Sequence, residues 1–119
     1  MSILIPEVKI LDPQSSYHRK KVNVVIKDGL ISSIGAANPK SERVIDIKGG
    51  ILSPGWFDLQ ANFSDPGYEH KEDLVSGREV AAAGGFTEVA LVPNTNPVIQ
   101  TKNDIEYIKR GNNSSLVQL

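Results

Sequence analysis

Two neutral amides at alternating positions near the end of a predicted strand are the residues best placed to do chemistry in this sequence. Successive side chains of a strand point to opposite faces, so Gln60 and Asn62 share one face. Two histidines at this spacing would direct two imidazoles at one metal ion. Amide oxygens bind hard ions such as calcium or magnesium but suit zinc badly. The pair therefore predicts a metal site that is altered or lost, and the alternative is that both amides only form hydrogen bonds.

The strand that carries these amides follows a Pro-Gly turn at residues 54–55, and a helix is expected over about 70–83. A regular strand would also place Asp58 on the face of Gln60, where a buried structural role is expected. In the helix, Leu74, Val75 and Ala81 are the buried candidates, and Gly77 permits close packing. The Gly-Gly pair at 84–85 ends the helix in a left-handed conformation.

A second strand and helix follow. Residues 87–92 form a nearly continuous apolar strand, as is typical of a parallel sheet covered on both faces. Thr101 is expected to cap a helix, with Asp104 three residues later, and Ile105 and Ile108 form its inner stripe. A third strand is predicted to begin at 115–119. This order of strands and helices indicates a parallel α/β architecture.

Residues 1–54 have a different, strand-rich pattern. Val22, Val24 and Ile26 share one face of a predicted strand. The Asp-Gly pair at 28–29 then predicts a hairpin turn into a second strand at 30–35. A short strand is expected at 44–47. We therefore expect two domains, a small β module at 1–54 and an α/β domain at 55–119.

The ordered motifs of residues 49–100 resemble those of dihydroorotases, zinc-dependent members of the amidohydrolase superfamily. The run Pro-Gly-Trp-Phe-Asp-Leu-Gln-Ala-Asn-Phe-Ser-Asp-Pro-Gly at 54–67 is similar to the first barrel strand of that family, whose pattern is Asp-x-His-x-His-x-Arg before Pro-Gly. Further likenesses follow at 69–73, at 81–87 and in the Pro-Asn-Thr-Asn-Pro loop at 93–97. The resemblance implies an α/β fold, the N-terminal portion of a TIM-like (β/α)8 amidohydrolase barrel, preceded by part of a small β-sandwich.

The same resemblance assigns roles to four positions. Gln60 and Asn62 stand where the family has its metal-binding histidines, so this chain has a degenerate metal motif and no cofactor is predicted for it, although the family uses zinc. Ser64 replaces the arginine that clamps the substrate carboxylate, and a serine cannot form that bidentate pair. Asn94 matches a residue that also contacts the carboxylate.

Two functions remain open on this sequence. The first is a non-catalytic dihydroorotase-like protein of pyrimidine biosynthesis that acts as a structural partner of aspartate carbamoyltransferase, as inactive homologues of the family do. The second is an active dihydroorotase or related cyclic amidohydrolase that uses ligands from later strands. A third option is a barrel that binds a small molecule without catalysing a reaction.

Composition and length set limits on both functions. With 13 basic and 14 acidic side chains and no cysteine, the sequence favours neither nucleic acid nor an acidic membrane surface as a partner and suits a reducing, cytoplasmic setting. A TIM-like barrel needs roughly 250 residues, so these 119 residues are expected to be the N-terminal part of a longer protein. Exposed strand edges would then favour self-association of this piece, and a homo-oligomer is possible.

Overall fold

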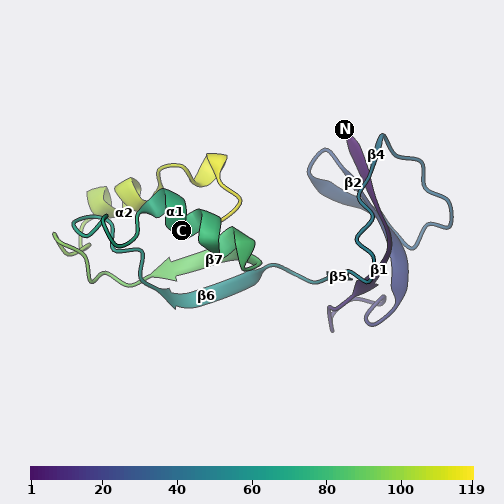
Figure 1. Ribbon diagram of the computed structural model, residues 1–119, viewed down its shortest axis with the longest axis horizontal. Helices are drawn as coiled ribbons and strands as arrows, with labels where there is room; N and C mark the ends of the chain where they lie inside the picture. The colour runs from purple at the N-terminus through teal and green to yellow at the C-terminus, as the bar shows by residue number, and fades with distance from the viewer. The chain divides into compact units, whose positions relative to one another are not determined.

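The computed structural model describes residues 1–119, which divide into two compact units, Met1–Pro54 and Gly55–Leu119. The first unit contains five strands, and the second contains a two-stranded sheet and two α-helices; Figure 1 shows the chain coloured from the N-terminus to the C-terminus. Neither helix has the length and apolar character required to span a lipid bilayer.

The unit at 1–54 is built around β1 (Ser2–Ile10), which has partners on both edges. On one edge it pairs antiparallel with β2 (Lys21–Lys27), which continues through the predicted Asp-Gly turn into β3 (Leu30–Ile34). On the other edge it pairs in parallel with β4 (Arg43–Val44) and β5 (Ile51–Leu52). The hairpin is thus confirmed, whereas the strand predicted at 44–47 is only two residues long and lies at 43–44.

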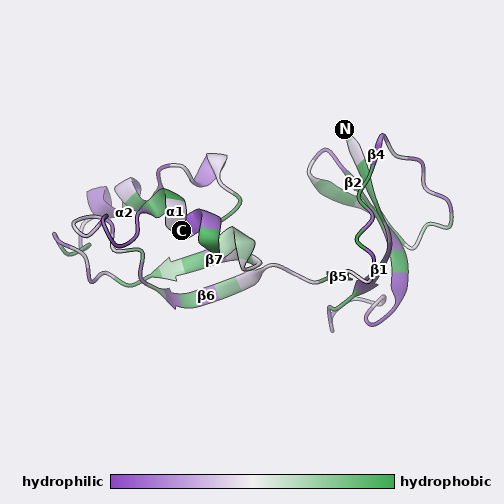
Figure 2. Ribbon diagram, in the orientation of Figure 1, coloured by the Kyte–Doolittle hydropathy of each residue, from purple (hydrophilic) through white to green (hydrophobic).

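The core of this unit comes from alternate residues of β1 and β2. Val8 and Val24 are fully enclosed, and Val22 and Ile26 pack against the same cluster, as the alternation predicted. Figure 2 shows the corresponding hydrophobic stretches on both strands.

In the unit at 55–119, β6 (Trp56–Ala61) and β7 (Phe86–Leu91) run parallel, as the alternating strand and helix pattern predicted. Helices α1 (Leu74–Ala83) and α2 (Lys102–Lys109) both lie on one face of this sheet (Figure 1). A short 3-10 turn, η1 (Asn112–Ser114), follows α2. The third strand expected at 115–119 is reduced to one parallel bridge between Glu88 and Gln118.

The core of this unit gathers residues from the loop after β6, from β7, from both helices and from the C-terminal segment. Its buried members are Phe63, Leu74, Val89, Ile108 and Val117. Gly77 on α1 lies over the Phe63 ring, where a Cβ atom would come within 2.6 Å of ring carbons. Gly77 therefore allows the close packing that the sequence suggested.

Several local predictions were wrong in detail. Helix α1 begins at Leu74 rather than near residue 70, because Asp73 caps it through hydrogen bonds from the Val75 and Ser76 amides. Val75 and Ile105, expected inside, are 65% and 50% exposed. Neither residue belongs to the core cluster of the unit.

The alternation of β6 is broken between Asp58 and Ala61. Asp58 pairs with Val89 and Ala61 with Leu91, so three steps along β6 match two steps along β7. This β-bulge places Asp58 and Ala61 in one hollow on the α1 side of the sheet. Asp58 is half-buried there, whereas Gln60 is exposed.

Candidate functional site

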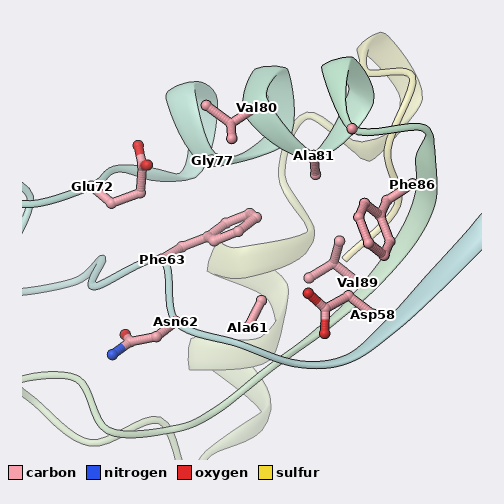
Figure 3. Close-up of a pocket in the computed structure, with 11 residues that line it drawn as sticks. Asp58, Ala61, Asn62, Phe63, Glu72, Gly77, Val80, Ala81, Phe86 and Val89 are labelled. Carbon is pink, nitrogen blue, oxygen red and sulfur yellow. The ribbon is translucent and has the colours of Figure 1, made fainter.

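The candidate site lies at the carboxyl end of β6, where two neutral amides alternate with two core residues. Ala61 and Phe63 pack against the core, whereas Gln60 and Asn62 are both exposed. Figure 3 shows Asn62 directed away from α1 while the Phe63 ring lies beneath that helix.

The Asn62 amide is occupied by its own loop. Its Oδ1 atom accepts hydrogen bonds from the Ser64 backbone N–H at 3.2 Å and the Ser64 hydroxyl at 3.4 Å. Ser64 has a φ angle of 63°, in the left-handed region that residues other than glycine and asparagine seldom adopt. The Asn62–Ser64 contacts offset part of that strain and hold the loop in this conformation.

The donor set at this strand end does not fit zinc. Gln60, Asn62 and Ser64 supply no imidazole, thiolate or carboxylate, which are the groups that bind zinc in proteins. The Asn62 oxygen, the best remaining ligand atom, already accepts two hydrogen bonds. Nowhere in residues 1–119 do three or more histidine, cysteine, aspartate or glutamate side chains gather as a metal site.

The loop after β7 brings Asn94 to the same end of the sheet. Asn94 is exposed, whereas Thr95 beside it is buried and donates its hydroxyl to the Pro97 carbonyl at 2.9 Å. The Asn96 N–H donates to the Pro66 carbonyl at 3.0 Å, which joins this loop to the loop after β6. Because β6 and β7 are parallel, Asn94 lies at the same edge of the sheet as the Gln60 and Asn62 pair.

Asp65, which no sequence motif singled out, holds the loop after β6 in place. Asp65 is only 7% exposed. One carboxylate oxygen accepts the Leu74 N–H at the start of α1 at 3.2 Å, and the other accepts the Tyr107 hydroxyl of α2 at 2.8 Å. An aspartate between a strand and a Pro-Gly turn was a signal of a turn, but nothing local in the sequence indicated Tyr107 as its partner.

The hydrogen bond to Asp65 raises the pKa of Tyr107 above its ordinary value, and burial adds to the shift. Because the pKa of Tyr107 is higher in the folded state than in the unfolded state, the hydrogen bond stabilises the fold fully below the unfolded-state pKa. This stabilisation is lost as the pH rises through the folded-state pKa.

We therefore expect Tyr107→Phe to lower the free energy of unfolding at neutral pH. The difference from the unsubstituted protein should shrink above about pH 10. Urea unfolding across pH 7–11 measures it, and a difference independent of pH would contradict the assigned bond.

A hollow of about 340 Å³ lies between β6, β7 and α1. Two carboxylates line it (Figure 3), and each accepts a nearby hydrogen bond. Asp58 Oδ1 accepts the Gln60 N–H at 2.9 Å, and Glu72 accepts the Ser76 hydroxyl. The rest of the lining is mainly apolar, including Phe63, Val80 and Phe86. This hollow is therefore a gap in the packing of strand and helix rather than a hydrolytic site.

The fold is shared with solved structures of low sequence identity. The structure is similar to L-hydantoinase (dihydropyrimidinase) from Arthrobacter aurescens, with a TM-score of 0.72 and 23% identity over 92% of this chain and 24% of that one. It is also similar to a Xaa-Pro dipeptidase, with a TM-score of 0.59 and 22% identity over 96% of this chain and 30% of that one. The chain belongs to the dihydroorotase-like family, whose model, described as Dihydro-orotase-like, matches residues 49–116.

Curated relatives agree with this membership. The chain is 34% identical to a dihydroorotase of Clostridioides difficile, over 98% of this chain and 28% of that protein. It is 41% identical to a dihydroorotase of Citrifermentans bemidjiense, over 91% of this chain and 26% of that protein. The chain therefore spans about a quarter of the length of these relatives.

Proposed function

We propose that the complete protein is a non-catalytic dihydroorotase-like protein of pyrimidine biosynthesis, with a structural role as a partner of aspartate carbamoyltransferase. The observation that carries this proposal is the donor set at the end of β6. Gln60 and Asn62 are neutral amides, Asn62 is bonded to Ser64, and none of the three offers a ligand that zinc prefers.

The chemistry of the family needs two features that this strand end does not supply. A metal-bound hydroxide is the nucleophile that attacks a cyclic amide, and its formation at neutral pH requires a strongly bound cation. A guanidinium must also hold the substrate carboxylate in place. Ser64 stands at that position with one short hydroxyl and no charge, so Asn94 would bind the carboxylate alone and weakly.

The proposal also includes a complete (β/α)8 barrel in the full-length protein, and other features of the second unit support it. Its strands are parallel and its helices lie on one face, as at the start of such a barrel. On β6, Phe57 and Leu59 are 55% and 77% exposed. Apolar side chains of this size on a strand indicate that further chain or a partner covers them.

The proposal is tested on the complete protein, purified without chelators, by elemental analysis together with a dihydroorotate hydrolysis assay. We expect neither stoichiometric metal nor turnover. Bound zinc with turnover would overturn the proposal and establish the alternative, an active cyclic amidohydrolase that takes its ligands from other strands.

Mixing the complete protein with the aspartate carbamoyltransferase of the same organism and measuring sedimentation tests the structural role. We expect a stable complex, and separate sedimentation of the two proteins would contradict the partnership.

Restoring the two histidines should not restore the reaction. We expect Gln60→His with Asn62→His to leave the complete protein without measurable dihydroorotate hydrolysis, even if it now binds zinc, because Ser64 still lacks the guanidinium. Metal content and turnover are measured on the same preparation. The matched control adds Ser64→Arg to the pair. Efficient hydrolysis by the double variant would show that the clamp is not required.

A further inference from the structure

A buried arginine without a charged partner lies on α1, away from the end of β6. Arg78 is 6% exposed. Its Nη2 atom donates to the carbonyls of Ile108 at 2.7 Å and Arg110 at 2.9 Å, and to Asn112 Oδ1 at 3.2 Å. The single ion pair of residues 1–119 joins the N-terminus to Asp28, so no carboxylate neutralises Arg78.

The hydrogen bonds of this guanidinium are also incomplete. The Arg78 Nε–H is buried and has no acceptor, and Nη1 has only a long contact of 3.4 Å to the Leu74 carbonyl. Burial lowers the pKa of Arg78, as expected for a cation that has lost water without gaining an anion. A buried guanidinium of this kind is normally paired with a carboxylate or phosphate.

Arg78 lines a groove of about 470 Å³ between α1 and the segment that follows α2. We call this the α1 groove. A second guanidinium, Arg110, and two hydroxyl residues, Ser114 and Ser115, line it as well, and Glu79 is its one acidic residue. The charged residues of the groove therefore carry a net positive charge, which favours an anionic group.

The remaining lining of the α1 groove is apolar. Val75 and Leu116 are 65% and 84% exposed, and Ala82 lies between the charged residues and the helix end. A bare inorganic anion would leave these side chains in water, whereas an aliphatic group next to a carboxylate would cover them. Both walls come from neighbouring segments within residues 55–119.

We propose that the α1 groove docks an acidic segment of a partner protein, in which a carboxylate lies next to an aliphatic side chain. The carboxylate binds between Arg78 and Arg110, with the hydroxyls of Ser114 and Ser115 as further donors. The aliphatic side chain packs on Val75 and Leu116. This interaction is independent of whether the complete protein hydrolyses anything, because no residue at the end of β6 contributes to the groove.

The first test uses N-acetyl-leucine as the smallest probe that joins a carboxylate to an aliphatic group, with N-acetyl-leucinamide as its uncharged match. The complete protein, labelled with ¹⁵N, is titrated while the Arg78 Nε–H resonance is followed. We expect saturable shifts with a low-millimolar Kd for N-acetyl-leucine and at least about tenfold weaker binding of the amide. Equal responses to both compounds would overturn the proposal. Equal shifts from inorganic phosphate would also overturn it, since they would indicate a site for small anions.

The second test changes the groove without removing Arg78, whose guanidinium also bonds the carbonyls at the end of α2. Arg110→Gln should weaken binding of N-acetyl-leucine about tenfold, because it removes one charged donor. Glu79→Gln should strengthen binding, since it removes the one like charge. Lys109→Gln is the matched control, because Lys109 is exposed at the same helix end but does not line the groove. An unchanged Kd for Arg110→Gln, or an equal loss for Lys109→Gln, would contradict the assignment.

Discussion

Gly67→Ala is expected to lower the free energy of unfolding of the 55–119 unit by about 3 kcal/mol or more. Gly67 has a φ angle of 101°, which an alanine adopts only with strain. A Cβ atom there would lie 2.0 Å from the Asn96 carbonyl oxygen. That oxygen belongs to the backbone and cannot rotate away, so the two loops must separate. The hydrogen bond from the Asn96 N–H to the Pro66 carbonyl should then be lost.

Gly85→Ala is the matched control for this substitution. Gly85 also has a positive φ angle, 88°, but a Cβ atom there would meet nothing within 4 Å. We expect a loss of about 1 kcal/mol, from backbone strain alone. Trp56, the one tryptophan of the sequence, lies in β6, so its fluorescence during urea unfolding reports on this unit. Equal losses in the two variants would contradict the close approach of the loops.

The second large effect is expected for Arg78→Met, which should lower the free energy of unfolding by about 2–4 kcal/mol. Methionine keeps much of the side-chain volume but removes every donor. The carbonyls of Ile108 and Arg110 at the end of α2 would then be left without the guanidinium that satisfies them. The positive charge also lies at the negative end of the α2 dipole, a stabilising position that methionine cannot keep.

Lys109→Met separates this bond network from a general effect of charge. Lys109 is a cation at the same end of α2 and is exposed, so its replacement should change stability by only about 0.5 kcal/mol. Urea unfolding followed by Trp56 fluorescence measures both variants. A loss for Arg78→Met as small as that of the control would show that relief from burying an unpaired cation offsets the lost hydrogen bonds.

Features that depend on neighbouring residues were predictable from the sequence. Thr101 and Asp104 form the predicted cap of α2, with hydrogen bonds of 3.3 Å and 2.9 Å between each side chain and the other's N–H. The hairpin at 28–29 and the turn at Gly85 follow equally local rules. In each case the partners lie within a few residues, so their types and spacing are enough to define the contact.

Features that depend on distant partners were not predictable in this way. Tyr107 is 42 residues from Asp65, and Ile108 is 30 residues from Arg78. Neither residue type specifies which of many possible groups it contacts. The β-bulge of β6 was also not predictable, because the register of β6 is set by its pairing with β7 rather than by the order of residues along β6.

The same distinction between local and distant contacts applies to the candidate site. The parallel order of the strands was enough to place Asn94 at the same edge of the sheet as Gln60 and Asn62. The bond from Ser64 to Asn62 Oδ1 and the hydrogen bond between the two loops were not foreseen. Both depend on the path of the backbone after the strand, which residue types alone leave open.

The hydrogen bonds of Asp65 have a consequence for how such a chain changes over evolutionary time. They fix the loop after β6 through Leu74 and Tyr107, without using the side chains of Gln60 or Asn94. Selection for folding alone would therefore preserve Asp65 and the glycine two residues later, while positions 60 and 94 could drift once a reaction was no longer required. Sequence similarity to an enzyme family at such a loop can therefore reflect selection for folding alone. Whether the protein catalyses a reaction has to be judged from the few side chains that do not contribute to folding.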